Sequence, residues 1–243
     1  MLTTQAIVIG EVNYRDNDKM LTLFSPEFGR LDALSRGCRK STAKLLAASQ
    51  LFVCGEFQFN TTKGKHYLAG CDISHSFYNL REDYNKIFAA QFFLEVTSAF
   101  ILPEQADKPL FYLLINALFA LENNMNSIEY IMLFFLVKCA QEIGIAPNLT
   151  ACTYCGAEDA RVFSIEGGGL ICNSCRQLTE NRIYMISEDE ISEIERIFLN
   201  PSKSIREHSH FSASKKFVDF MCEYLQNKTD CHFKTYPVLR KIL

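Results

Sequence analysis

The sequence predicts an α+β protein with an N-terminal five-stranded β-barrel, an α-helical bundle after it, and a small four-cysteine ribbon inserted in the bundle. Three observations lead to this fold class. Apolar and polar residues alternate in short runs through the first 78 residues, apolar residues recur at helical spacing after Leu80, and two Cys-x-x-Cys pairs follow. A chain of 243 residues can hold two such domains. We therefore place a barrel domain at residues 1–79 and a helical domain at residues 80–243, with the ribbon at about residues 150–178.

Five β-rich runs make up the predicted barrel. Pro26 and Gly29 mark a turn after the second run, and Gly64 marks a hairpin after the fourth. Residues 36–50 lack strand periodicity, and we expect a loop with a short helix there. Five strands with one irregular insertion after the third suit an OB-fold, with its helix between strands three and four; an SH3-like barrel is the alternative. The expected strands span residues 2–12, 19–24, 29–35, 51–60 and 66–77.

Helices are predicted for most of the remaining chain. Pro103 and Pro109 interrupt the helical pattern that begins at Arg81. Ser127 is a suitable N-cap and Gly144 a suitable C-cap for a later helix. Acidic residues at positions 188–190 favour the positive end of another helix dipole. The expected helices span residues 81–100, 110–122, 127–143, 187–200 and 212–226, and the basic tail at residues 232–243 is expected to be irregular.

The two cysteine pairs predict a zinc ribbon. The pairs are separated by 16 residues, which matches the four-cysteine zinc pattern. Gly156 follows the first pair, where the chain must turn past the metal, and residues 161–165 and 170–171 suit two short strands around a glycine turn. Four thiolates close the tetrahedral shell of Zn²⁺, so we expect one structural ion rather than a catalytic one. Buried or redox-active cysteines are the other interpretation. The predicted ligands are Cys152, Cys155, Cys172 and Cys175.

Composition and motifs favour a protein without catalytic machinery. Apolar residues make up 48% of the chain and charged residues 22%, and the net charge is −3. We expect no secretory signal and no membrane span, and therefore reduced cysteines in a cytosol. There is no phosphate-binding glycine loop and no HExxH motif. His208 and His210 could form a metal pair, although a solvated loop is the favoured interpretation. We therefore expect that the protein is not an enzyme.

Positive charge gathers in the predicted barrel. Residues 1–80 contain nine basic and seven acidic residues, for a net charge of +2, which leaves −5 for the rest of the chain. Residues 30–44 alone carry +4 and include the glycine-containing basic loop from Arg36 to Lys44. Lys63, Lys65 and His66 lie at the predicted hairpin, and Tyr67 adds an aromatic face. Cations on loops and aromatic faces on strands suit nucleic-acid binding by an OB-fold, whereas a solvated basic loop is the alternative.

The order of these parts resembles the bacterial recombination mediator family RecO. Residues 4–19 resemble that family's opening strand and turn, and residues 23–30 its second strand and turn. Residues 33–40 resemble its basic loop, and residues 239–243 its usual terminus. The resemblance covers essentially the whole chain.

The resemblance implies a non-enzymatic protein of DNA repair and recombination. Members bind single- and double-stranded DNA, anneal complementary strands, dock on the C-terminal tail of the single-strand binding protein SSB, and act with RecR to load RecA on gapped DNA. This implies a cytoplasmic, nucleoid-associated protein. Carried over to this chain, the resemblance implies a DNA surface formed by Arg15, Lys19, Arg30, Arg36, Arg39, Lys40 and Lys44, with Lys63 and Lys65 as further members.

Two other functions remain open from the residues themselves. The acidic balance after residue 80 suits a zinc-ribbon scaffold that holds protein partners and has little DNA affinity of its own. A zinc-containing enzyme that modifies nucleic acid would need an open metal position, which four cysteine ligands do not leave.

Overall fold

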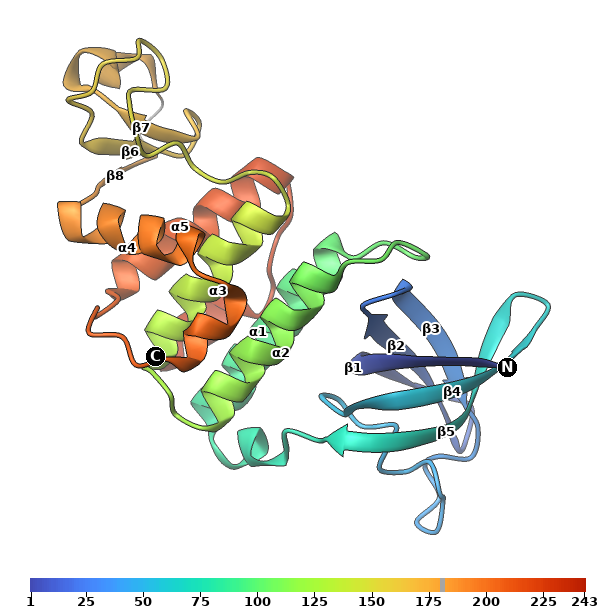
Figure 1. The fold of residues 1–243 in the computed structure, drawn as a ribbon. Coiled ribbons are helices and arrows are strands. Elements are labelled where there is room, and N and C mark those ends of the chain that lie inside the picture. The colour runs from blue at the N-terminus through green and yellow to red at the C-terminus, as the bar shows by residue number, and fades with distance from the viewer. Residues whose placement is uncertain (180–181) are drawn as a thin grey trace. The chain divides into compact units, whose positions relative to one another are not determined.

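The computed structural model describes residues 1–179 and 182–243, which form two compact units, Met1–Leu118 and Phe119–Leu243 (Figure 1). The barrel lies in the first unit, and the cysteine ribbon lies in the second. Helix α2 continues from the first unit into the second. The assignment of domains to residues 1–79 and 80–243 stays a prediction.

A closed five-stranded barrel begins the chain. The strands follow one another around it in the order β1-β2-β3-β5-β4, and β4 pairs with β1 to close it. All pairs are antiparallel except β3 and β5, which run parallel. This OB-like arrangement confirms the predicted α+β class and disfavours the SH3-like alternative. The strands are β1 (Leu2–Tyr14), β2 (Asp18–Ser25), β3 (Gly29–Ser35), β4 (Cys54–Thr62) and β5 (Lys65–His75).

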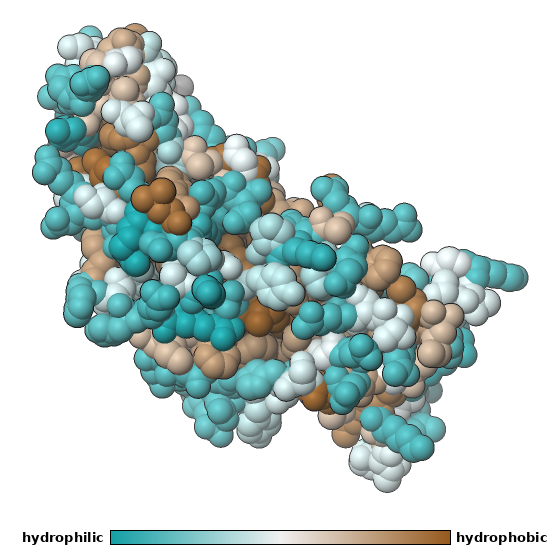
Figure 2. Space-filling view, viewed as in Figure 1, coloured by the Kyte–Doolittle hydropathy of each residue, from teal (hydrophilic) through white to brown (hydrophobic). Residues whose placement is uncertain are grey.

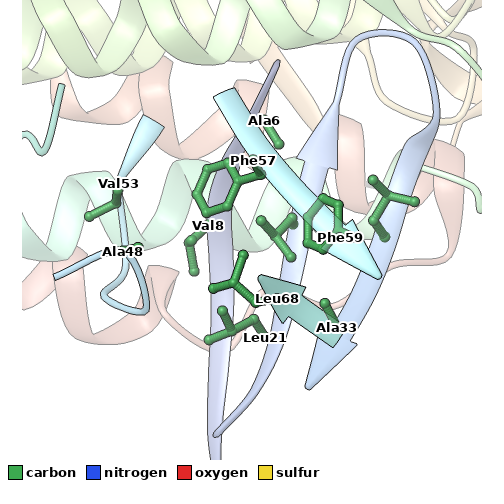
Figure 3. Close-up of a cluster of buried hydrophobic side chains, with 11 residues drawn as sticks. Ala6, Val8, Leu21, Ala33, Ala48, Val53, Phe57, Phe59 and Leu68 are labelled. Carbon is green, nitrogen blue, oxygen red and sulfur yellow. The ribbon is translucent and has the colours of Figure 1, made fainter. Parts of the chain in front are cut away.

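The barrel core follows from the period of two along each strand. On β3, Leu31 and Ala33 are buried while Asp32 between them is exposed, and on β4 Phe57 and Phe59 point inward together. Figure 3 shows these side chains converging from several strands. Burial of a leucine or phenylalanine side chain stabilises the fold by roughly 1.5–3 kcal/mol.

The segment between β3 and β4 differs from the prediction. Residues 36–50 form successive turns rather than a short helix, because most of their backbone hydrogen bonds join residues three apart, such as Ala43 N to Lys40 O at 2.9 Å. The predicted fourth strand also begins later, at Cys54. Phe52 has a positive φ of 69°, which is incompatible with regular strand geometry, so the strand can begin only after it.

Two helical elements complete the first unit after β5. A short 3₁₀ helix, η1 (Tyr78–Glu82), precedes α1 (Tyr84–Phe100). Helix α1 begins three residues later than predicted because the carboxylate of Asp83 caps it by accepting from Asn85 N at 2.8 Å. Within this unit, Arg30 N donates to Leu102 O at 3.1 Å, which joins the start of β3 to the loop before α2 (Lys108–Glu122).

Helix α3 (Ile128–Glu142) is the centre of the second unit. Every residue from Tyr130 to Ala140 is buried, as expected for a helix that is apolar around much of its girth. The predicted N-cap is confirmed, since Ser127 Oγ accepts from Tyr130 N, and Gly144 follows the helix with a φ of +81°. Other helical elements of this unit are η2 (Asn173–Leu178), α4 (Glu188–Leu199), η3 (Ser202–Arg206), α5 (Lys215–Thr229) and α6 (Tyr236–Ile242).

Helix α6 corrects the expectation of an irregular tail. Its seven residues are too few to display helical periodicity, and tertiary contacts stabilise it instead. Tyr236 Oη donates to Asp219 Oδ1 of α5 at 2.6 Å, and Arg240 forms an ion pair of 2.8 Å with the same carboxylate.

The ribbon forms a three-stranded sheet in the order β7-β6-β8. Strands β6 (Val162–Ser164) and β7 (Gly169–Ile171) are the predicted hairpin, whereas β8 (Ile183–Met185) is an additional strand that the sequence did not predict. Strand β8 has only three residues, and it forms because it pairs with β6.

Aromatic side chains join the ribbon to α5. The ring of Phe163 lies 4.8 Å from Phe220 and 5.4 Å from Tyr224, measured between centroids. Tyr184 of β8 stacks on Phe217 and Phe220. Ribbon and helix therefore share one packed core.

No helix in residues 1–179 and 182–243 is long and apolar enough to cross a membrane. The face of the molecule drawn in Figure 2 is largely hydrophilic, with apolar patches scattered over it.

Candidate nucleic-acid interface and metal centre

A groove of about 560 Å³ lies on the outside of the barrel. The β1–β2 turn contributes to one side of it, the outer faces of β2 and β3 form its floor, and the β4–β5 hairpin forms the other side. In OB-folds, this strand face and these two loops bind oligonucleotides and oligosaccharides. The lining residues are Tyr14, Arg15, Met20, Asp32, Leu34, Arg36, Gly64, Lys65, His66 and Tyr67.

Strand register explains why these residues meet. Met20 of β2 lies opposite Leu34 of β3, and Leu34 lies opposite Tyr67 of β5 in the parallel pair. Because side chains alternate between the two faces of a strand, these three share the outer face of the barrel. Val12 and Tyr14 extend this face onto β1, where Val12 lies opposite Met20. The floor of the groove therefore carries apolar and aromatic side chains beside the carboxylate of Asp32.

Two of the cations stack on aromatic rings. The guanidinium carbon of Arg36 lies 4.4 Å from the ring centroid of Tyr67, and that of Arg15 lies 5.2 Å from the ring centroid of Tyr14. Cation–π contacts of this kind hold a flexible guanidinium in place while its charge remains available. Lys65 adds a third cation, against the single carboxylate of Asp32, which pairs with Arg30 at 3.2 Å. The groove is therefore positively charged.

The loop after β3 is tied to the β1–β2 turn. Arg39 donates from Nη1 to the backbone oxygen of Asp16 at 3.1 Å, and Gly37 N donates to Asp18 Oδ1 at 2.7 Å. Lys40 and Lys44 follow in the same loop and are exposed. This loop therefore presents cations next to the turn that carries Arg15.

Three of the predicted DNA-binding residues lie neither in the groove lining nor in the loop after β3. Lys19 is buried, with its Nζ 2.8 Å from Glu11 Oε2 and 3.2 Å from Ser49 O. Its charge is therefore paired within the barrel unit. Arg30 lies near the opposite end of β3 from Arg36. Lys63 occupies the tip of the β4–β5 hairpin, outside the groove lining.

Sequence reasoning missed Tyr14 and Met20 as members of this surface. A signal for Tyr14 was present, because it shares the period-two pattern of Val12 and lies beside Arg15 at the end of a strand. Met20 carried no such signal, since an apolar residue in a β-rich run is also expected in the core. His66 was noted with the hairpin, and its Nδ1 lies 2.9 Å from Thr61 Oγ1.

The second site is the four-cysteine cluster of the ribbon. Gly156 has a φ of +78°, and its N–H donates to Cys152 O at 2.8 Å, which forms the first tight turn. In the second turn, Cys175 N donates to Cys172 O at 3.1 Å. The ligand atoms of all four cysteines lie within 4.8 Å of one another, although two of the cysteines come before the hairpin and two after it.

The donor set fits a tetrahedral metal ion. Zinc–sulfur bonds of ~2.3 Å place the sulfurs of a tetrahedral site about 3.8 Å apart, and Cys155 Sγ lies 3.7 Å from Cys172 Sγ. Burial raises the pKa of Cys152, but backbone N–H groups of Cys172, Cys155 and Tyr154 lower it more, to about 6.

A single thiolate thus forms readily, but four would repel one another. The neighbouring Cys155 thiol and burial raise the pKa of Cys175 to about 12. A cation is needed to hold four thiolates at these distances, and thiolate ligands select soft metals such as zinc, copper(I) or the iron of iron–sulfur clusters. The cluster can therefore bind a metal ion.

Among the described residues, the four cysteines are the one group with three or more suitable ligands within reach of a common ion. His208 and His210 contact each other edge to face, with ring centroids 5.4 Å apart, and belong to no such group.

Comparisons with known proteins match both parts of the chain to one family. The family model described as "Recombination protein O N terminal" matches residues 1–77, and the one described as "Recombination protein O C terminal" matches residues 81–201. A "DNA repair protein RecO" of Acetivibrio thermocellus is 31% identical over 176 residues, or 72% of this chain and 70% of the relative. A protein of the same name from Exiguobacterium sp. is 28% identical, over 98% of this chain and 94% of the relative. Another from Alkaliphilus metalliredigens is 26% identical over the full length of both chains.

Proposed function

Because the chain belongs to the RecO family of DNA repair proteins, we propose that it is a non-enzymatic recombination mediator that binds single- and double-stranded DNA. The observation that carries this proposal is the groove on the ligand-binding face of the barrel, which combines aromatic rings with the cations Arg15, Arg36 and Lys65. Cations bind phosphates of any DNA, and aromatic rings bind bases of a single strand.

Cations on a single barrel also suit strand annealing. Two complementary strands repel each other through their phosphates, and a protein that neutralises this charge lets them approach. In the pathway that the family resemblance implies, the protein docks on the C-terminal tail of SSB, acts with RecR, and thereby promotes RecA loading on gapped DNA. It would act in the cytoplasm at the nucleoid.

The metal of the ribbon is proposed to be one structural Zn²⁺ held by Cys152, Cys155, Cys172 and Cys175. Bound zinc supplies folding free energy to a small unit that cannot form a core of its own. The ribbon in turn provides Phe163 and Tyr184 to the aromatic packing on α5. The metal thus supports the helical unit and leaves no open position for catalysis.

The test is fluorescence anisotropy of a labelled single-stranded oligonucleotide and of a duplex, each titrated at several salt concentrations. For Z phosphates neutralised, log K should fall with log salt at a slope of roughly 0.9Z for duplex and 0.7Z for single strands. Changing Arg36, Lys40 and Lys44 together to Glu should abolish most of the binding. The matched control changes the exposed Lys203, Lys215 and Lys216 to Glu, which alters the net charge equally in the other unit.

A scaffold function is the second candidate, supported by the charge of −5 after residue 80. It predicts that RecR and SSB bind equally well to the Arg36, Lys40 and Lys44 variant, and that the wild-type protein binds DNA weakly even at low salt. If the two triple variants lose DNA affinity equally, the assignment of DNA binding to the barrel is wrong.

A further inference from the structure

We propose that Cys155 and Cys172 of the cysteine cluster form a reversible oxidation site. A peroxide converts their two thiolates into a disulfide, which releases the metal ion but keeps the ribbon closed. The metal crosslink between the two turns of the cluster is thereby exchanged for a covalent one. This inference rests on the proposed zinc site and adds an oxidised state to it.

The four cysteines differ in their access to solvent. Cys155 is exposed, whereas Cys152, Cys172 and Cys175 are buried. Cysteines that bind zinc do so as thiolates, which is the form that peroxide oxidises. Because susceptibility to oxidation follows thiolate character and exposure, a peroxide molecule in solvent reacts first with Cys155.

A second sulfur lies next to this exposed thiol. Cys155 Sγ is 3.7 Å from Cys172 Sγ, so the two atoms need to approach by about 1.7 Å to form a disulfide bond of ~2.05 Å. Cys152 is less suited to this attack, because backbone N–H groups donate to its sulfur. Hydrogen bonds that stabilise a thiolate also lower its nucleophilicity. Cys172 is therefore the partner of Cys155 in the disulfide.

The reaction takes place in two steps. In the first, the thiolate of Cys155 attacks one oxygen of hydrogen peroxide, an S–O bond forms, the O–O bond breaks and hydroxide leaves. In the second, the thiolate of Cys172 attacks the sulfur of this sulfenic acid, an S–S bond forms, the S–O bond breaks and a second hydroxide leaves. The two sulfurs together lose two electrons, which reduce the peroxide.

The disulfide removes one ligand from each turn of the cluster. The first turn keeps Cys152 and the second keeps Cys175, and two thiolates do not complete the four-coordinate shell of a structural zinc ion. The ion is therefore released. The same disulfide joins the two turns covalently, and a crosslink that closes a loop stabilises the folded form by restricting the unfolded chain.

Backbone hydrogen bonds hold the two turns side by side independently of the metal. Thr153 N in the first turn donates to Leu170 O of β7 at 2.8 Å, and β7 leads directly into the second turn. Lys228 Nζ of α5 donates to Glu166 O at 2.8 Å, which fastens the hairpin turn to the helix. The oxidised ribbon should therefore retain β6, β7 and their packing on α5.

The experiment treats the zinc-loaded, full-length protein with hydrogen peroxide. Zinc release is followed with a metallochromic dye, disulfides by peptide mass mapping, and the ribbon by hydrogen exchange. We expect release of zinc, a disulfide between Cys155 and Cys172, and slow exchange at residues 162–164 and 169–171. Dithiothreitol with added zinc should restore the starting state. Cys172→Ser loses a ligand without gaining a crosslink, and should exchange fast at the same residues.

Two histidine variants test the order of the steps. Histidine can replace one thiolate in a zinc site, so Cys155→His and Cys172→His should both retain zinc. Without the exposed thiolate, Cys155→His should release zinc at least about 10-fold more slowly in peroxide than the wild type. Cys172→His keeps the exposed thiolate but lacks its partner, so dimedone should trap a sulfenic acid on Cys155. Cys231→Ser, outside the cluster, should react like the wild type.

The outcomes separate this inference from the proposed zinc site. If the purified protein holds no zinc, both fail. If it holds zinc and peroxide does not form the disulfide between Cys155 and Cys172, only the present inference is overturned. A disulfide within one turn, such as Cys152 with Cys155, or fast exchange of the hairpin after oxidation, also overturns it. The disulfide map and the exchange rates come from the wild-type protein, so they decide the matter even if a histidine variant does not fold.

Discussion

Arg39 donates a hydrogen bond of 3.1 Å from Nη1 to the backbone oxygen of Asp16, and its own N–H donates to Asn17 O at 3.0 Å. These two bonds join the loop after β3 to the turn between β1 and β2. The turn carries Arg15, which lines the groove. The guanidinium of Arg39 is therefore placed to position the turn, in addition to any contact of its own with DNA.

Arg39→Ala should weaken DNA binding by releasing the turn rather than by removing a phosphate contact. We expect the affinity to fall severalfold while the slope of log K against log salt is unchanged, and hydrogen exchange at residues 14–18 to become faster. Lys40→Ala is the comparison, since loss of one phosphate contact lowers that slope by roughly 0.7–0.9. A reduced slope for Arg39→Ala would identify Arg39 as a direct phosphate contact.

Lys19→Ala should destabilise the barrel. Its ammonium lies 2.8 Å from Glu11 Oε2, and its side chain is only 10% exposed, so removal leaves a carboxylate without its partner. We expect a loss of about 2 kcal/mol in the free energy of unfolding by urea. Lys44→Ala, at an exposed loop position, should cost less than about 0.5 kcal/mol. Equal stabilities of the two variants would contradict a structural role for Lys19.

Cys172→Ser should unfold the ribbon and destabilise the helical unit while the barrel strands remain largely intact. Loss of a ligand removes metal-binding energy that also folds the ribbon, and the packing of Phe163 on Phe220 is lost with it. Hydrogen exchange should become faster at residues 148–179 and 182–186 and along α5, and remain slow in β1 and β4. Cys231→Ser, outside the cluster, should retain one bound zinc by metal analysis. A barrel that unfolds in the same step would refute the independence of the two units.

Tyr224 should contribute to loss of stability at alkaline pH. Burial raises its pKa from 10.0 to about 12, and its Oη donates to Ile145 O at 2.8 Å. Because the folded pKa lies above the unfolded one, this contribution is complete below pH 10 and is lost as the pH rises through about 12. Tyr224→Phe should therefore cost about 1 kcal/mol at pH 8, and less at pH 11.5.

The measurement is urea unfolding of both proteins across this pH range. Tyr78→Phe, at an exposed position, should leave the profile unchanged. A constant difference between wild type and Tyr224→Phe from pH 8 to pH 11.5 would show that the hydroxyl does not titrate differently in the folded and unfolded states.

The features that the sequence by itself determined are local ones. Alternation along each strand identified the barrel core, because a period of two assigns Phe57 and Phe59 to one face without knowledge of the partner strand. The spacing of Cys152, Cys155, Cys172 and Cys175 identified a cluster that can hold a metal ion, because two residues between cysteines suffice for a tight turn that aims both sulfurs at one point. The first signal lies within one strand, and the second consists of two short motifs separated by 16 residues.

Only the tertiary structure decided which residues share a surface. Periodicity separates the two faces of a strand but does not state register or closure. The parallel pairing of β3 with β5 places Tyr67 beside Leu34 and under Arg36, and thereby creates the groove. The segment between β3 and β4 likewise packs on Lys19, whose Nζ donates to Ser49 O 30 residues away, and so this side chain is buried although its charge suggested the surface. Contacts between distant segments depend on how the whole chain packs, and a pattern within one segment cannot carry that information.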